Sequence, residues 1–193
     1  MINLKISNWS KVVRLFALFG FLSMATFSLP ACSKKSKAPE VSMAAPSIGR
    51  IRASYRIALA QYGVHVVKVG QVVRVFIPTD TLFVAGSANL RPGQGILLAT
   101  IARYIGTYKT IYVKVAAYTD DYLPAPIRLA LSDKRAEVVG NRIWVNGIDS
   151  RIVTALGKAA RNPVDSNAYK SGRRHNRRVE ITFKYFADRY QLL

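Results

Sequence analysis

The residues with the clearest potential for chemistry lie in the stretch 118-YTDDYLPAPIRLALSDKRAEVV-139. It opens with the neighbouring carboxylates Asp120 and Asp121, and Arg135 follows in a run with helical spacing. A carboxylate binds an ammonium group, and an arginine binds a carboxylate through two parallel hydrogen bonds. Asp120 and Arg135 are therefore candidates for a site that binds a charged ligand. Two plainer interpretations stay open: Asp120 caps a helix, and Arg135 is a solvated helix residue.

Enzymatic and metal chemistry have no comparable support in the sequence. There is no evident pair of nucleophile and base, so we predict binding and not catalysis. His65 and His175 are far apart in the chain, and together with the single cysteine, Cys32, they do not form a metal-ligand pattern. We therefore expect no enzyme activity, no metal and no cofactor.

The elements around these residues predict a mixed α/β domain. Alternating apolar residues indicate strands, and apolar residues three and four apart indicate helices. The expected order is a helix over 49–62, a hairpin over 64–69 and 72–77, a helix from a cap at Ser87 or Asn89 to Gly106, a strand over 110–118, a helix over 126–145, a β-like segment over 151–156, a polar loop over 157–175 and a strand over 178–185. This order predicts an α/β two-layer sandwich, with a mixed sheet and helices on one face.

The second long helix, over 126–145, is expected to be amphipathic. Its predicted core-facing residues are Ile127, Leu131, Val138, Val139 and Ile143. Its predicted wetter side carries Ser132, Lys134 and Arg135. Four tyrosines cluster around one helix–strand corner, and we expect them to pack in the core and not to form an interface patch; they are Tyr104, Tyr108, Tyr112 and Tyr118.

The beginning of the chain predicts export. Residues 1–31 combine a basic start with an apolar run that is shorter than the ~20 residues of a membrane-spanning helix, which is typical of a secretory signal. The run ends in Leu29-Pro30-Ala31-Cys32, which resembles a bacterial lipobox. The resemblance implies a lipid on Cys32, and Ser33 after it favours the outer membrane. A cleaved signal with an unmodified thiol is the alternative. Residues 32–49 are predicted to be the lipidated cysteine and a flexible tether, and 50–193 the domain.

The charge of the chain predicts polyanionic surroundings. Lys and Arg number 29 against 10 Asp and Glu, which gives a formal net charge of +19. Nucleic acid is not expected as a partner because the chain is predicted to be exported. Lipid headgroups, lipopolysaccharide and peptidoglycan carboxylates are the polyanions of that environment. A general basic bias that serves only solubility is the alternative.

Several motifs recur at spacings that point to one family. They are Phe83, Gly86-Ser-Ala-Asn-Leu90, Thr119-Asp120, Leu131-Ser132, Arg135-Ala136, Asn162-Pro163-Val164, Asn167 and Asn176-Arg177-Arg178-Val179-Glu180-Ile181. From Phe83 to Phe183 the chain resembles the OmpA-like domain of outer-membrane porin tails, Pal lipoproteins and flagellar stator proteins. The resemblance implies that Asp120 and Arg135 bind the zwitterionic end of diaminopimelate in the peptidoglycan stem peptide. It implies the same ligand for the neighbouring motif residues Thr119, Leu131, Asn176, Arg177 and Arg178.

The chain also departs from the family pattern. Ala117-Tyr118 replace a frequent Gly-His, Leu123 and Ala159 replace glycines, and Arg128 replaces an asparagine. Lost glycines limit how closely a ligand approaches the backbone. Arg128 either strengthens carboxylate binding or blocks the pocket, and Asp121 is placed to pair with it.

Together these features predict an outer-membrane lipoprotein whose periplasmic domain tethers the membrane, or an envelope complex, to peptidoglycan. A small, basic lipoprotein of this design also resembles the OmpA-like subunits of Dot/Icm type IVB secretion systems, which implies secretion-complex or other envelope proteins as partners. The alternative is a structural subunit that keeps the fold but does not bind peptidoglycan. Residues 184–193 extend past the family's usual end, either as a short helix or as a tail that docks on a partner.

Overall fold

The computed structural model describes residues 45–187, which lie within one compact unit. The predicted signal, Cys32 and most of the predicted tether lie outside the described residues, as does the end of the C-terminal extension. Within 45–187, none of the helices has both the length and the apolar character that crossing a bilayer requires.

A mixed five-stranded sheet forms one layer of the domain. Its strands are β1 (His65–Val69), β2 (Val72–Pro78), β3 (Thr110–Tyr118), β4 (Val153–Ala159) and β5 (Arg178–Tyr185). They lie side by side in the order β1-β2-β5-β3-β4. Only β3 and β4 run parallel, and the other neighbouring pairs are antiparallel. The prediction of a mixed sheet is confirmed.

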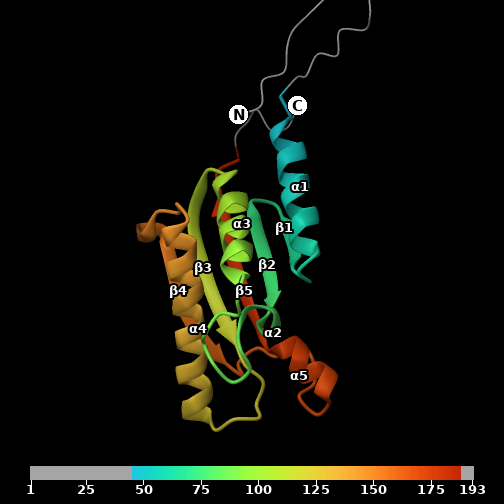
Figure 1. Ribbon diagram of the computed structural model, residues 1–193, viewed down its shortest axis with the longest axis vertical. Helices are drawn as coiled ribbons and strands as arrows, with labels where there is room; N and C mark the ends of the chain where they lie inside the picture. Colours follow the sequence, from blue (N-terminus) through green and yellow to red (C-terminus); the bar gives the residue numbers. More distant parts are fainter. Residues whose placement is uncertain (1–44, 188–193) are drawn as a thin grey trace, which may run out of the picture. The chain divides into compact units, whose positions relative to one another are not determined.

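Helices form the second layer (Figure 1). The helical elements are α1 (Ile48–Ala60), α2 (Thr79–Leu82), α3 (Gln94–Gly106), α4 (Ala125–Val145), a 3-10 turn (Ser150–Ile152) and α5 (Lys170–Asn176). The long helices α1, α3 and α4 pack on one face of the sheet, which is the predicted two-layer arrangement.

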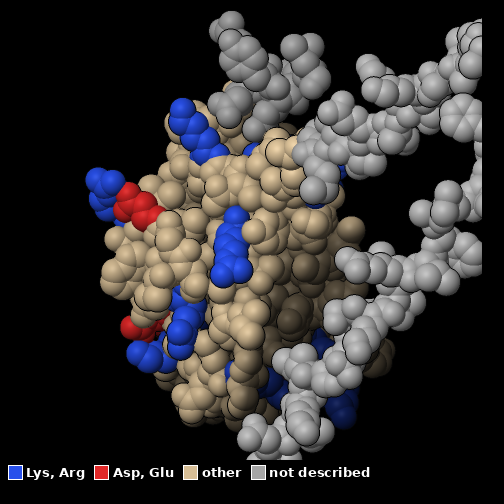
Figure 2. Space-filling model, turned by 45° about the horizontal axis from the view of Figure 1, so that its top comes forward, with Lys and Arg blue, Asp and Glu red and all other residues tan. Residues whose placement is uncertain are grey.

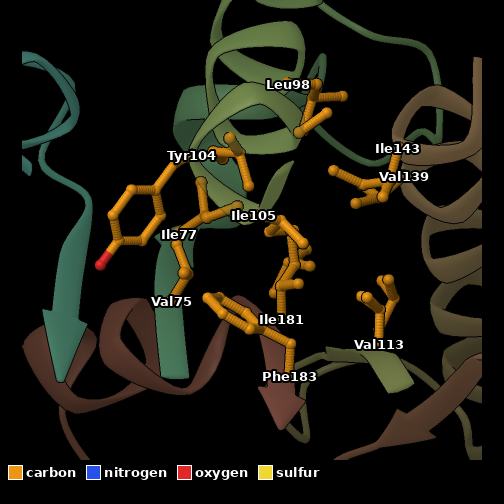
Figure 3. Close-up of a cluster of buried hydrophobic side chains, with 14 of the residues drawn as sticks. Val75, Ile77, Leu98, Tyr104, Ile105, Val113, Val139, Ile143, Ile181 and Phe183 are labelled. Atoms are coloured by element: carbon orange, nitrogen blue, oxygen red, sulfur yellow. The ribbon is translucent and has the colours of Figure 1, made fainter. Parts of the chain in front are cut away.

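The core lies between the sheet and these helices (Figure 3). On the central strand β5, Val179, Ile181 and Phe183 are fully buried and alternate with less buried residues, as expected for a strand with one covered face. Val75 on β2 pairs with Ile181 and shares its face. The α3 residue Tyr104 contacts the ring of Phe183 edge to face, with ring centroids 6.2 Å apart.

Two short helices and one helix start differ from the predictions. The structure starts α3 at Gln94, so the predicted caps at Ser87 and Asn89 are wrong. Gly93 precedes the helix with φ 80°, a left-handed conformation that interrupts a helical run. The sequence also gave no signal for α2, and the predicted polar loop over 157–175 contains the end of β4 and the start of α5.

The predicted orientation of α4 is wrong in part, and the difference matters for function. Val139 and Ile143 are buried and Lys134 is exposed, as predicted. Ser132 and Arg135, expected on the wetter side, have exposed fractions of 0% and 4%, whereas Ile127 is 53% exposed. The buried face of α4 consists of Ser132, Arg135, Ala136, Val139, Gly140 and Ile143. Small residues on this face let α4 approach β4 closely, since an added Cβ at Gly140 would lie 3.1 Å from the Cβ of Ala155.

Of the four tyrosines predicted to cluster, Tyr104 and Tyr108 pack together in the core, whereas Tyr118 lies at the other end of β3. The packed pair leads to a test of stability. The hydroxyls of Tyr104 and Tyr108 lie 3.1 Å apart in the core, and burial raises the pKa of Tyr104. Tyr108→Phe leaves the Tyr104 hydroxyl without this partner, so we expect the free energy of unfolding to fall by about 1–3 kcal/mol in urea titrations. Tyr62→Phe, at an exposed position, is the matched control and is expected to change little. Equal stability of the two variants would contradict the role of the hydroxyl pair.

Candidate functional site

The candidate site lies at the end of the sheet where β3 and β4 finish. These strands are parallel, so their C-terminal ends meet at one edge. Thr119 follows β3, and its N–H donates to the carbonyl of Ala159 at 2.9 Å. The end of β2 reaches the same edge, because the Thr79 N–H donates to the carbonyl of Arg177 at 3.0 Å. Asp120, Arg177 and α2 are thereby brought to one end of the domain.

Asp120 is nearly buried at this edge, with an exposed fraction of 9%. Its Oδ2 accepts a hydrogen bond from Arg177 Nη1 at 2.9 Å. From the described residues, its Oδ1 accepts a single long hydrogen bond, 3.4 Å, from the N–H of Tyr122. The Asp120 carboxylate therefore retains accepting capacity for a further donor.

Arg135 is held in place from one side only. Its Nε donates to the carbonyl of Ser87 at 2.8 Å, and its guanidinium lies 5.3 Å from the centre of the Phe83 ring. Among residues 45–187, its two Nη groups have no hydrogen-bond partner. Burial lowers the pKa of Arg135, an effect opposed by the nearby charges of Asp80 and Asp120. A desolvated guanidinium with free donors is a strong anchor for an incoming carboxylate.

Asp80 belongs to this site although the sequence analysis did not identify it. It lies on α2, and both of its carboxylate oxygens accept from Arg177: Oδ2 from Nη2 at 2.8 Å and Oδ1 from Nε at 3.3 Å. Arg177 thus bridges Asp80 and Asp120, and these hydrogen bonds raise its pKa. A short-range signal for Asp80 was absent, because 97 residues separate it from Arg177.

The Asp80–Arg177 pair predicts a pH-dependent contribution to stability. Hydrogen bonds from Arg177 hold the pKa of Asp80 below its ordinary value of 3.8, although partial burial opposes this shift. A carboxyl with a depressed pKa stabilises the fold above its unfolded pKa and loses that contribution as the pH falls through the folded pKa. We expect Asp80→Asn to cost less than about 1 kcal/mol at pH 7, because the Asp80 side chain is 44% exposed. The difference from the parent protein should shrink below pH 3.8 in urea titrations. A difference that grows in acid would contradict this assignment.

Two other predicted site residues are occupied by the protein itself. Asn176 is 1% exposed, and its amide makes four hydrogen bonds to the loop residues Val164, Asp165 and Asn167. Arg178 donates to Glu180 at 2.7 Å and to the carbonyl of Asn162 at 3.1 Å. Of the two predicted arginines, Arg177 is therefore the one whose side chain faces Asp120.

Thr119 and Leu131 complete the predicted set. Thr119 is 4% exposed, and its hydroxyl has no hydrogen-bond partner among residues 45–187. Leu131 is half-buried on α4, next to Ser132. The Ser132 hydroxyl accepts from the N–H of Ala159 at 3.0 Å, which ties α4 to the end of β4.

The departures from the family pattern have visible consequences. Ala159, at a position of a family glycine, has φ 49°, a conformation that is strained for alanine. Arg128 Nη1 donates to the main-chain carbonyl of Asp121 at 2.8 Å, so Arg128 holds the loop after Asp120 through its backbone. Tyr118 is buried under Arg178, whose guanidinium lies 3.9 Å from the ring centre.

A cavity of about 570 Å³ lies beside this site, and neither Asp120 nor Arg135 lines it. Apolar side chains of β2 and the side chains of Arg174, His175 and Arg177 form part of its wall. Arg177 thus contacts both the cavity and Asp120. Chemically, the candidate site offers a ligand the nearly buried Asp120 carboxylate and Arg135 guanidinium, beside the paired Asp80 and Arg177. No group of three or more metal-ligating side chains occurs within 45–187.

Comparison with known proteins agrees with this geometry. The model of the OmpA family matches residues 82–177. The probable lipoprotein YiaD of Escherichia coli K12 is 32% identical over 120 residues, which are 62% of this chain and 55% of that protein. The peptidoglycan-binding protein ArfA of Mycobacterium tuberculosis H37Rv is 32% identical over 94 residues, 49% of this chain and 29% of that protein. The chain therefore spans about half or less of these relatives.

Solved structures show the same fold. The cell wall anchor of the T6SS from Pseudomonas aeruginosa superposes with a TM-score of 0.63 at 32% identity, over 73% of this chain and 99% of that chain. A putative MotB-like protein from Desulfovibrio vulgaris superposes with a TM-score of 0.64 at 23% identity, over 72% of this chain and 92% of that chain. The second likeness concerns the fold alone.

Proposed function

Because the chain belongs to the OmpA family, we propose that it is a peptidoglycan-binding anchor of the cell envelope, with Asp120 and Arg135 as its charged contacts. The observation that carries this proposal is the state of Arg135. Arg135 is 4% exposed and held by Ser87 and Phe83, yet both Nη groups lack a partner among the described residues, and neither is fully enclosed. Burying a charge is costly unless it is paired, so such an arginine fits a protein that pairs it with a ligand.

The ligand that suits the site carries an ammonium and a carboxylate on one carbon. The ammonium group binds Asp120 at the Oδ1 that accepts the long hydrogen bond from the N–H of Tyr122. The carboxylate binds the two Nη groups of Arg135 as a fork. The distal end of diaminopimelate has this chemistry. Arg177 holds Asp120 and Asp80 in position, and it supplies positive charge beside the ligand carboxylate.

The membrane end of the proposed anchor is Cys32. A lipid on this thiol, after removal of residues 1–31, attaches the chain to the outer membrane, with 33–49 as the tether and the domain in the periplasm. The described chain begins at the end of the domain opposite the site. There Arg52 of α1 donates to the carbonyl of Thr107, and the N–H of Phe186 donates to that of Lys109 just before β3. The site lies at the other end of β3, so the domain spans the gap between its two attachments.

The test uses two kinds of cell wall that differ at the proposed contact. Sacculi with diaminopimelate carry the distal carboxylate, and sacculi with lysine in its place do not. We expect the chain from Ser33 to co-sediment with the first kind at about 0.15 M salt and at higher salt, and to leave the second kind in the supernatant. Equal binding to both kinds, removed by salt, would show that net charge and not the site is responsible.

A second candidate function is favoured by one contact. The Oδ2 of Asp120 is already bonded to Arg177, so the protein satisfies part of its own site. A subunit that keeps the fold and binds proteins in place of peptidoglycan would have this arrangement. The finer proposal is an OmpA-like subunit of a type IVB secretion apparatus. Absence of binding to either kind of sacculus, with recovery of secretion-complex subunits by crosslinking of the full chain, would favour this function.

A further inference from the structure

The end of the domain opposite the candidate site carries a basic surface with exposed apolar side chains. We call it the basic end and define it by Arg50, Lys68, Lys109 and Lys184 together with Ile48, Val69 and Phe186. These residues come from α1, β1, the loop before β3 and the end of β5. Hydrogen bonds and strand pairing join these segments. The Tyr185 hydroxyl donates to the carbonyl of Gly70 at 3.0 Å, and Lys184 pairs with Val72 across the sheet.

Acidic residues are missing from the segments that build this end. Residues 48–72, 103–114 and 182–187 contain no Asp or Glu, although each contains Lys or Arg. Arg50, Lys68, Lys109 and Lys184 are exposed, and no acidic side chain within 45–187 forms an ion pair with them. Asp149, which precedes β4, is paired with Arg151. Asp188 follows Phe186 by two residues and lies outside the described residues, with Arg189 directly after it. By contrast, Asp80, Asp120, Asp121 and Asp165 all lie in the loops and short helix at the site end.

Apolar side chains stand among these cations. Val69 is 73% exposed, Phe186 52% and Ile48 44%. The ammonium of Lys109 lies 5.8 Å from the Phe186 ring centre, and that of Lys68 lies 5.4 Å from the Tyr185 ring centre. Figure 2, in which this end comes forward, shows several separate blue Lys and Arg side chains on a mainly tan face and red acidic ones at its left margin. Cations that alternate with exposed aromatic and aliphatic groups are typical of surfaces that lie on a bilayer.

We propose that the basic end lies against an anionic lipid surface. Arg50, Lys68, Lys109 and Lys184 contact lipid phosphates, and Phe186, Val69 and Ile48 sit at the level of the headgroups. The orientation rests on the proposed function, since a lipid-anchored chain enters the domain at α1, at this end. The contact adds a second, non-covalent attachment to the membrane and directs Asp120 and Arg135 away from it. An acidic protein is the other conceivable partner, but it would not need the exposed apolar groups.

The test separates this surface from net charge. The chain from Ser33, which contains all the described elements and no lipid, is titrated with vesicles of phosphatidylcholine with or without phosphatidylglycerol. One variant carries Lys68→Gln, Lys109→Gln and Lys184→Gln. The control carries Lys158→Gln, Arg161→Gln and Lys170→Gln, which remove the same charge near the site end. Lys34, Lys35 and Lys37 of the predicted tether are present in all proteins.

Each cation near an anionic surface raises the affinity for that surface about fivefold, so the first variant should bind anionic vesicles on the order of 100-fold more weakly. The control variant should lose much less, and none of the proteins should bind pure phosphatidylcholine. Equal losses in both variants, or no binding of the parent chain to anionic vesicles, would overturn the proposal. The same proteins are also tested on diaminopimelate sacculi, where neither variant touches Asp120 or Arg135. Failure on sacculi with retained vesicle binding would reject the peptidoglycan proposal alone, and the reverse result would reject the lipid proposal alone.

Discussion

Asp120→Asn is expected to lower the affinity for diaminopimelate-type peptidoglycan by at least about 30-fold. Asparagine keeps the shape of the side chain but removes the negative charge that the ligand ammonium requires. Truncating one partner of a desolvated charge pair costs about 2–5 kcal/mol, and 1.4 kcal/mol corresponds to a factor of ten. Asp120 meets this condition because it is 9% exposed. Co-sedimentation isotherms with purified sacculi at about 0.15 M salt give the affinities.

Arg135 and Asp121 provide the matched comparisons for this experiment. Arg135→Lys keeps the positive charge but removes the fork, and it is expected to weaken binding to a similar degree. Asp121→Asn removes the same charge one position away at an exposed side chain, and it should leave binding nearly unchanged. If Asp121→Asn and Asp120→Asn have the same effect, the site assignment is wrong and general charge determines the binding.

Gly157→Ala is expected to destabilise the domain by about 3 kcal/mol and to disturb the site at the same time. Gly157 lies in β4, directly under α4, and its N–H donates to Asp133 Oδ1 at 2.7 Å. An added Cβ would lie 2.5 Å from the Ser132 hydroxyl oxygen and would overlap the backbone nitrogen of Asp133. Overpacking of a rigid contact typically costs about 1–3 kcal/mol, and here backbone must move. Thermal unfolding should show a decrease in Tm of roughly 6–12 °C.

Gly95→Ala is the control for this substitution. Gly95 lies in the first turn of α3, where an added Cβ meets no atom within 4 Å, and alanine favours a helix. We expect its Tm to stay equal or to rise. Gly157→Ala should also move Ser132 and Asp133. Arg135 follows them closely on α4 and would move with them, so binding to sacculi should weaken. A Gly157→Ala protein with unchanged Tm would contradict the close packing of α4 on β4.

The sequence by itself determined the strands in which apolar and polar residues alternate. The strands over 110–118 and 178–185 coincide with β3 and β5, because alternation of apolar residues directly reports which face of a strand is covered. The predicted hairpin coincides with β1 and β2 for the same reason. The motif spacing also indicated the family, since Asp120 and Arg135 are recognisable by type and separation without any coordinates.

Only the tertiary structure decided how those residues are presented. The sequence did not reveal that Ser132 and Arg135 lie on the buried face of α4, because polar residues usually face solvent. Their burial depends on contacts with Ser87, Phe83 and Ala159, which are distant in sequence. Asp80 joined the site through Arg177, a contact made possible by the neighbouring positions of β2 and β5 in the sheet. A hydrophobic period records which residues avoid water. The satisfaction of a buried charge depends on groups that are distant in sequence and become neighbours only when the chain is folded.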